Sequence, residues 1–162
     1  PEDFASTEKV KSLPLYKDTQ FLVTRTNHPL QHKKKVTLKD TLKFDWILPE
    51  HERTLSLFNI NNQFLKNNLK HPNPKIVYNS ANFALNVIKN SDYIGIHPKQ
   101  MIETQGEGVF SILDIEGIIM EPSYGITYLE NKIKRKSVEL LIEELILVSK
   151  EMIRMGLVKN IG

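Results

Sequence analysis

The sequence predicts an α/β fold, in which helices alternate with the strands of a largely buried sheet. Three observations predict it: short apolar runs rich in β-branched and aromatic residues, helical apolar stripes between them, and a proline or glycine after most runs. Strands that are nearly continuous apolar runs are typical of a sheet covered on both faces. We therefore expect a sheet with helices packed on each side.

The expected strands are short and each ends at a proline or a polar turn. They cover residues 20–26, 45–49, 75–79, 91–98, 109–115 and 124–129. The expected helices lie between them, at 36–42 as a single turn, at 55–69, at 81–89, in one or two turns after Pro98, and at 135–154. We expect Thr37, Thr54, and either Asn79 or Ser80 to cap helices, since hydroxyl and amide side chains favour that position.

Apolar spacing also predicts which helix faces point inward. Helix 55–69 carries Leu57, Ile60 and Phe64 on one stripe, and Trp46 is expected in the core beside it. The inner side of helix 81–89 is predicted as Phe83, Ala84, Val87 and Ile88, and that of helix 135–154 as Val138, Leu141, Ile142, Leu145, Val148 and Met152.

The composition is that of a globular chain. Hydrophobic residues make up 40% of the 162 residues and charged residues 25%, which suffices for one domain or two small lobes. No apolar run has the ~18 residues that a transmembrane helix needs, and residues 1–10 have no signal-peptide core. The sequence does not begin with Met, so we expect a fragment. Zero cysteines exclude disulfides and thiolate metal sites and fit a cytoplasmic location.

The net charge of +3 argues weakly against nucleic-acid contact by this chain. A dedicated DNA-binding surface is usually more basic and richer in arginine, because arginine reads bases and phosphates bidentately. Only four arginines are present: Arg25, Arg53, Arg135 and Arg154. The run Lys33–Lys35 has no interleaved arginine or aromatic residue, and its simplest interpretation is a solvated loop.

The expected binding site lies where strands end, because α/β sheets bind ligands at the carboxyl ends of strands beside helix N-termini. The residues at these ends that we expect to bind a small molecule are Pro49, Glu50, Arg53, Thr54, Asn79, Ser80 and His97. The competing interpretation is structural: a solvated loop before a capping Thr54, and a helix cap at Asn79 or Ser80.

No catalytic or metal constellation accompanies these residues. His28 and His32 are four apart, but Pro29 removes the helical geometry that a two-histidine metal site would need. Glu50, His51 and Glu52 lack a nucleophile motif nearby. We therefore expect no catalytic residue, metal or cofactor.

The order of several segments resembles the effector-binding domain of LysR-type transcriptional regulators. The resemblance covers residues 13–155 and rests on these segments together: FLVTRTNHPL, VTLKDTLKFDWILP, KIVYNSANFALNVIKNSDYIGIHP, FSILDI and YGITYLENKIKRKSVELLIEELI. One departure is VIKNSDYIGIHP, where Asn90 and Ser91 replace a region in which the family commonly has glycine.

The resemblance implies a two-lobe periplasmic-binding-protein-like (type 2) architecture with one lobe complete and the other partial. Residues 1–19 would be the end of the first lobe and the first crossover, residues 20–119 the second lobe, and residues 120–162 the return strand and a C-terminal helix of the first lobe. The N-terminal helix-turn-helix would be missing.

The resemblance also implies the function: a non-enzymatic, cytoplasmic regulatory domain that senses a small anionic effector in the cleft between its lobes. Its partners would be that effector and further copies in a homodimer or tetramer, with helix 55–69 taking part. DNA would be contacted through the missing domain and not through this chain, and no membrane is expected. The alternative is a solute-binding protein of a transporter, which shares the fold; an enzyme on this architecture is a third option.

Overall fold

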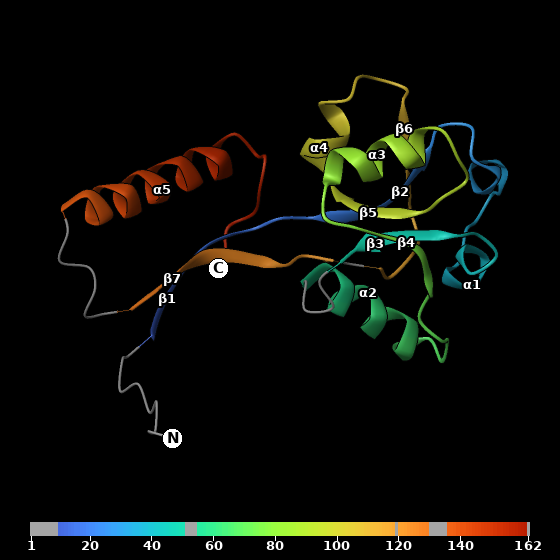
Figure 1. Cartoon of the computed structure of the whole chain (residues 1–162), viewed down its shortest axis with the longest axis horizontal. Coiled ribbons are helices and arrows are strands. Elements are labelled where there is room, and N and C mark those ends of the chain that lie inside the picture. Colours follow the sequence, from blue (N-terminus) through green and yellow to red (C-terminus); the bar gives the residue numbers. More distant parts are fainter. Residues whose placement is uncertain (1–9, 51–54, 119, 130–135, 162) are drawn as a thin grey trace. The chain divides into compact units, whose positions relative to one another are not determined.

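The computed structural model describes residues 10–50, 55–118, 120–129 and 136–161. The chain divides into two compact units, one made of residues 1–18 and 123–162 and the other of residues 19–122. Figure 1 shows their elements.

The unit of residues 19–122 is built on a mixed sheet. Strand β2 (Gln20–Arg25) lies between β5 (Gly95–Pro98) and β6 (Phe110–Leu113) and is antiparallel to both. Strand β3 (Trp46–Pro49) pairs in parallel with β4 (Pro74–Tyr78). Two backbone hydrogen bonds, from Ile47 to Ile94 and from Ile94 to Asp45, both 3.0 Å, attach β3 to the residue before β5. The resulting order is β4-β3-β5-β2-β6.

Helices cover both faces of this sheet, as the sequence predicts. One core contains Trp46 and Leu48 packed with Ile60 and Phe64 of α2 (Leu55–Lys66), and it includes Leu38 of the short α1 (Leu38–Thr41). The opposite core joins Ile47 to α3 (Ala81–Lys89), and α4 (Lys99–Glu103) lies on the same side in Figure 1. Successive residues of β3 thus point to opposite cores.

Two expectations about the helices are wrong in detail. Helix α2 ends at Lys66 rather than at 69, because Asn68 adopts the left-handed conformation with φ 55°. Phe83 does not face inward: its side chain is 51% exposed, and Leu85 occupies the buried position with Ala84 and Ile88. A run of four apolar positions is compatible with two adjacent faces, and only packing chooses between them.

The segment after β2 has the structural roles that the sequence predicts: Thr37 caps a helical turn and Trp46 lies in the core. His28 precedes the 3-10 helix η1 (Pro29–His32), and its Nδ1 accepts a hydrogen bond from the Leu30 amide at 3.1 Å. Thr37 caps α1 through a reciprocal capping box with Asp40. Trp46 is 1% exposed and donates its indole N–H to the Thr41 carbonyl at 3.1 Å.

The other unit contains a two-stranded antiparallel ladder of β1 (Val10–Lys17) and β7 (Ser123–Leu129). The strands approach closely at Gly125, where an added Cβ would lie 2.5 Å from the Leu13 carbonyl oxygen. The rings of Tyr16 and Tyr124 stack at 5.4 Å.

Helix α5 (Lys136–Arg154) lies in the same unit as this ladder. The predicted apolar stripe is only partly covered: Ile142 is half-buried, but Leu141, Leu145 and Val148 are exposed, and the buried position is Ser149. The prediction that all six stripe residues form an inner side is therefore wrong for these three in this structure.

Candidate functional site

The carboxyl ends of three strands meet at one edge of the larger unit's sheet. Strands β3 and β4 are parallel, with Pro49 opposite Tyr78, and the Glu50 amide donates to the Tyr78 carbonyl at 2.7 Å. The parallel bridge between Trp46 and Ile94 gives β5 the same direction as β3. His97 therefore ends its strand at the same edge, and we call Pro49, Glu50, Tyr78, Asn79, Ser80 and His97 the strand-end edge.

This edge brings together five of the seven residues that the sequence predicts for the site: Pro49, Glu50, Asn79, Ser80 and His97. The remaining two, Arg53 and Thr54, lie outside the described residues, so their assignment stays a prediction. Glu50, Asn79 and Ser80 are exposed, whereas Pro49 is half-buried at the end of β3.

Ser80 begins α3 and has a structural role of its own. Its hydroxyl oxygen accepts a hydrogen bond from the Phe83 amide at 3.4 Å, so of the two expected caps the serine is the one used. The bond occupies a lone pair only, and the O–H proton can still be donated to a ligand. The first turn of α3 directs further backbone N–H groups toward this end of the helix.

His97 is the buried member of the edge. Its side chain is 1% exposed, and the imidazole stacks on the ring of Tyr78 with centroids 5.9 Å apart. Burial lowers the pKa of His97 to about 4, so the ring is neutral at pH 7. Within the described part of the chain, its Nε2 atom is buried and has no hydrogen-bond partner. A buried polar atom of this kind is costly unless something else satisfies it.

Tyr78 belongs to the edge although sequence reasoning assigned it no function. It is half-buried, and burial raises the pKa of its phenol to about 12, so the hydroxyl keeps its proton at pH 7. The sequence could have pointed to Tyr78 through its position directly before Asn79, at the end of an expected strand. Tyr78 and His97 thus form a stacked pair of aromatic rings, both uncharged at pH 7.

The described residues of this edge form no catalytic or metal-binding cluster. No nucleophile lies in hydrogen-bond contact with a base among its described residues, and the described chain holds no group of three or more His, Cys, Asp or Glu side chains that could bind a metal. The His28 ring is instead buried in the loop after β2, with its Nε2 3.2 Å from the Asp92 carbonyl oxygen, and burial lowers its pKa. Within the described residues, no helix is long and apolar enough to cross a membrane.

Solved structures with a similar fold include regulatory domains that were determined with a bound small molecule. Similar structures include the regulatory domain of CcmR from Synechocystis PCC6803 in complex with 2-PG, with 15% identity, a TM-score of 0.73, and 94% of this chain and 73% of that chain covered. The effector-binding domain of QuiR in complex with shikimate gives 19% identity, a TM-score of 0.71, and coverage of 93% and 69%. The cofactor-binding domain of the Cbl transcriptional regulator gives 16% identity and a TM-score of 0.72, with 95% of this chain and 68% of that chain covered.

These likenesses define a periplasmic-binding-protein-like fold. The family model described as the LysR substrate binding domain matches residues 2–147. The chain therefore belongs to the LysR substrate-binding domain family, which confirms the predicted resemblance, the fold class and the effector-binding regulatory function over the transporter alternative. No curated protein matches the chain.

Proposed function

We propose that the strand-end edge binds a small anionic metabolite, with a carboxylate as its anionic group. The observation that carries the proposal is that the carboxyl ends of β3, β4 and β5 meet beside the N-terminus of α3, where Ser80 is exposed. A carboxylate could accept hydrogen bonds from the Ser80 hydroxyl and from the first-turn amides of α3. Arg53, which the sequence predicts for the same site, would add a bidentate partner for the anion.

In this proposal the effector acts by shifting a conformational equilibrium. A ligand can do so only if it binds one arrangement of the protein more tightly than another. The complex of the CcmR regulatory domain with 2-PG and that of the QuiR domain with shikimate support a small, polar effector for this fold.

The cellular location, the oligomeric state and the mode of DNA binding are proposed from family membership. The domain would work in the cytoplasm, without catalysis, as part of a homodimer or tetramer in which α2 contributes to contacts between copies. DNA would be bound by a separate helix-turn-helix domain of the same protein and not by this chain. The predicted lobe boundaries at residues 19 and 119 belong to the same proposal.

The test is ligand binding by thermal shift and calorimetry with 2-PG, shikimate and a panel of small mono- and dicarboxylates. Binding to the folded state raises the melting temperature, and the stabilisation grows with the logarithm of one plus the ratio of ligand concentration to Kd. For any ligand found, we expect Arg53→Ala, Ser80→Ala and His97→Phe to weaken binding by about tenfold or more each, the equivalent of ~1.4 kcal/mol.

Thr37→Ala is the matched control for Ser80→Ala, because both remove a helix cap but Thr37 lies outside the strand-end edge. It should lower the melting temperature without changing Kd. Wild-type affinity in Arg53→Ala, Ser80→Ala and His97→Phe would overturn the site.

A further inference from the structure

Two asparagines of the chain are followed by serine, in the pairs Asn79–Ser80 and Asn90–Ser91, and none is followed by glycine. An asparagine before a small residue is chemically labile, because the backbone nitrogen of that residue can reach and attack the carbon of the side-chain amide. The two pairs have the same chemistry but different surroundings. The fold holds one of them in place and leaves the other free to react.

Asn90 follows the last residue of α3 and is held by hydrogen bonds. Its Nδ2 donates to the Asn86 carbonyl at 2.8 Å, and its backbone lies at φ −107° and ψ 13°. The Ser91 amide, which would be the attacking group, donates to the Ile88 carbonyl at 3.4 Å. Closing the Asn90 side chain onto the Ser91 nitrogen would break both bonds, so this pair is protected.

Asn79 lies between β4 and α3 and is not held in this way. Asn79 and Ser80 are both exposed. Among the residues that the structure describes, neither the Asn79 side chain nor the Ser80 amide makes a hydrogen bond. The carbon of the Asn79 amide is therefore accessible, and the Ser80 nitrogen is available to attack it.

The first turn of α3 leaves the Ser80 amide without an acceptor. At α1, the amide of the capping residue Thr37 is bound by the Asp40 carboxylate at 3.1 Å, in a reciprocal capping box. The corresponding position in α3 is Phe83, whose ring offers no acceptor for that amide. Half of a capping box is thus present at α3, and the unused half is the nitrogen next to Asn79.

We propose that Asn79 is a deamidation site, at which an amide of the strand-end edge becomes a carboxylate. The Ser80 backbone nitrogen gives its proton to hydroxide and forms a bond to Cγ of Asn79. The bond from Cγ to the side-chain nitrogen breaks, and that nitrogen takes a proton from water and leaves as ammonia, which closes a succinimide ring. Water then opens the ring at either carbonyl to give aspartate or isoaspartate. No atom is oxidised or reduced.

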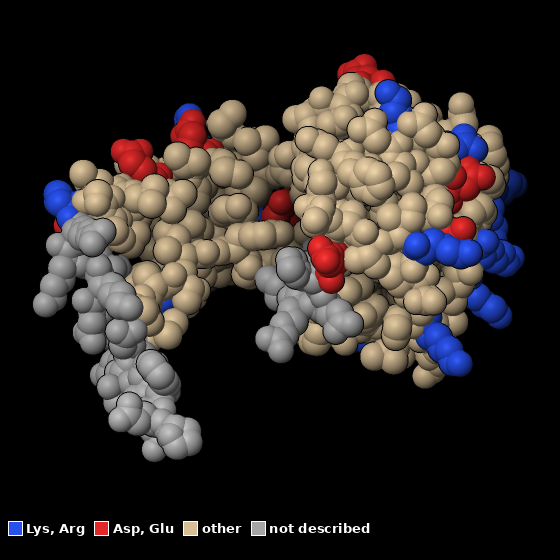
Figure 2. Space-filling view, viewed as in Figure 1, with Lys and Arg blue, Asp and Glu red and all other residues tan. Residues whose placement is uncertain are grey.

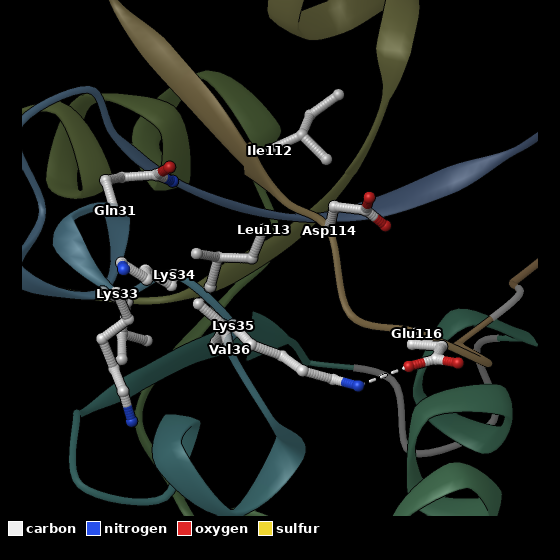
Figure 3. Close-up of a pocket in the computed structure, with 10 residues that line it drawn as sticks. Gln31, Lys33, Lys34, Lys35, Val36, Ile112, Leu113, Asp114 and Glu116 are labelled. Carbon is white, nitrogen blue, oxygen red and sulfur yellow. Dashed lines mark hydrogen bonds and ion pairs between the residues drawn. The ribbon is translucent and has the colours of Figure 1, made fainter.

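The new charge would fall where few charges lie. The described members of the strand-end edge include one carboxylate, that of Glu50, and no lysine or arginine. Lysines gather elsewhere: Figure 2 shows blue side chains on the side of this unit where α1 lies. Figure 3 shows Lys33, Lys34 and Lys35 in a groove of about 530 Å³ beside β6, the outermost described strand on its side of the sheet.

A carboxylate at residue 79 would compete with an anionic ligand. It would repel the ligand and would itself interact with the positive N-terminus of α3, which a ligand's carboxylate would otherwise use. This consequence rests on the proposed function, whereas the deamidation itself does not.

The test is incubation of the wild-type chain at mildly alkaline pH, followed by tryptic digestion and mass spectrometry. Trypsin separates the two sites into peptides 76–89 and 90–99, and deamidation raises the mass of a peptide by about 1 Da. In the folded chain we expect Asn79 to convert at least about tenfold faster than Asn90, and in urea the two rates should converge. Equal rates in the folded chain, or no conversion of Asn79 while the unfolded chain converts, would overturn the proposal.

Phe83→Gln supplies the acceptor that a capping box needs and should slow the conversion of Asn79 by about fivefold or more. The matched control is Phe83→Leu, which removes the same exposed ring without adding an acceptor and should convert at the wild-type rate. Equal rates in the two variants would overturn attack by the Ser80 amide.

The effect on binding is measured with any anion that binds the wild-type chain. Asn79→Asp reproduces one product of the reaction and should bind that anion at least about tenfold more weakly than Asn79→Gln, which has a neutral side chain. Equal affinity in the two variants would overturn the effect on binding. If no anion binds the wild-type chain, the proposed function fails, and the conversion rates still decide whether Asn79 is a deamidation site.

Discussion

The ring of Tyr78 stacks on the imidazole of His97, with centroids 5.9 Å apart and planes inclined by 24°. The two residues end β4 and β5, which are separated in the sheet by β3. The aromatic contact therefore reaches across β3 and connects the two strands that precede α3 and α4. Burial keeps the His97 imidazole uncharged at pH 7, which has a measurable consequence for stability.

We predict that stability decreases between pH 6.5 and pH 4 because of His97. The pKa of its imidazole is about 4 in the folded chain and about 6.5 when unfolded. In this window the unfolded chain binds a proton that the folded chain does not, so the free energy of unfolding falls by up to about 1.4 kcal/mol per pH unit. Urea unfolding at several pH values measures the slope.

His97→Phe keeps an aromatic partner for Tyr78 and removes the titration, so its stability should change less steeply between pH 6.5 and pH 4. Some dependence should remain, since burial also lowers the pKa of His28. A slope in His97→Phe equal to that of wild type would show that His97 is not the titrating group.

We predict that His28→Ala destabilises the fold by about 2–4 kcal/mol, because it leaves a cavity and removes the partners of the Leu30 amide and the Asp92 carbonyl. His28 is fully buried and lies 4.5 Å from the Phe44 ring centroid. His32→Ala, on the exposed end of η1, should change stability by no more than about 0.5 kcal/mol. Equal effects in chemical denaturation would contradict this account.

We predict that Gly95→Ala destabilises the fold by about 1–3 kcal/mol through overpacking. An added Cβ would lie 2.5 Å from Cδ1 of Ile88, which is itself fully buried on α3. Ile88→Val removes that methyl group, so the double variant should be more stable than the sum of the two single changes implies. Strictly additive losses in a double-mutant cycle would place the strain elsewhere.

The order of helices and strands could be predicted because local signals are strong here. Prolines after DWIL and IGIH mark strand ends, and Thr37 and Ser80 cap helices as their side chains favour. Trp46 was predictable as core because it lies inside an apolar run. These features depend on neighbouring residues, and no distant contact is needed to recognise them.

The sequence predicted less well which face of each helix is buried and where each helix ends. Phe83 and Leu141 both match an apolar spacing, yet both are exposed. Helix α3 has apolar residues on two adjacent sides and buries only the side that meets the sheet. Among the described residues of α5, the buried one is Ser149, so its apolar stripe is not covered by the ladder. Asn68 ended α2 by adopting a left-handed conformation that asparagine tolerates but does not require.

By itself the sequence determined the α/β class, the element order and the family, since periodicity, caps and the order of segments are local properties. The tertiary structure alone decided that five predicted residues lie on one edge, that Tyr78 joins them, and that Lys33–Lys35 flank the open side of β6. Strand order and direction place residues distant in sequence side by side, and these depend on pairing that no local pattern records.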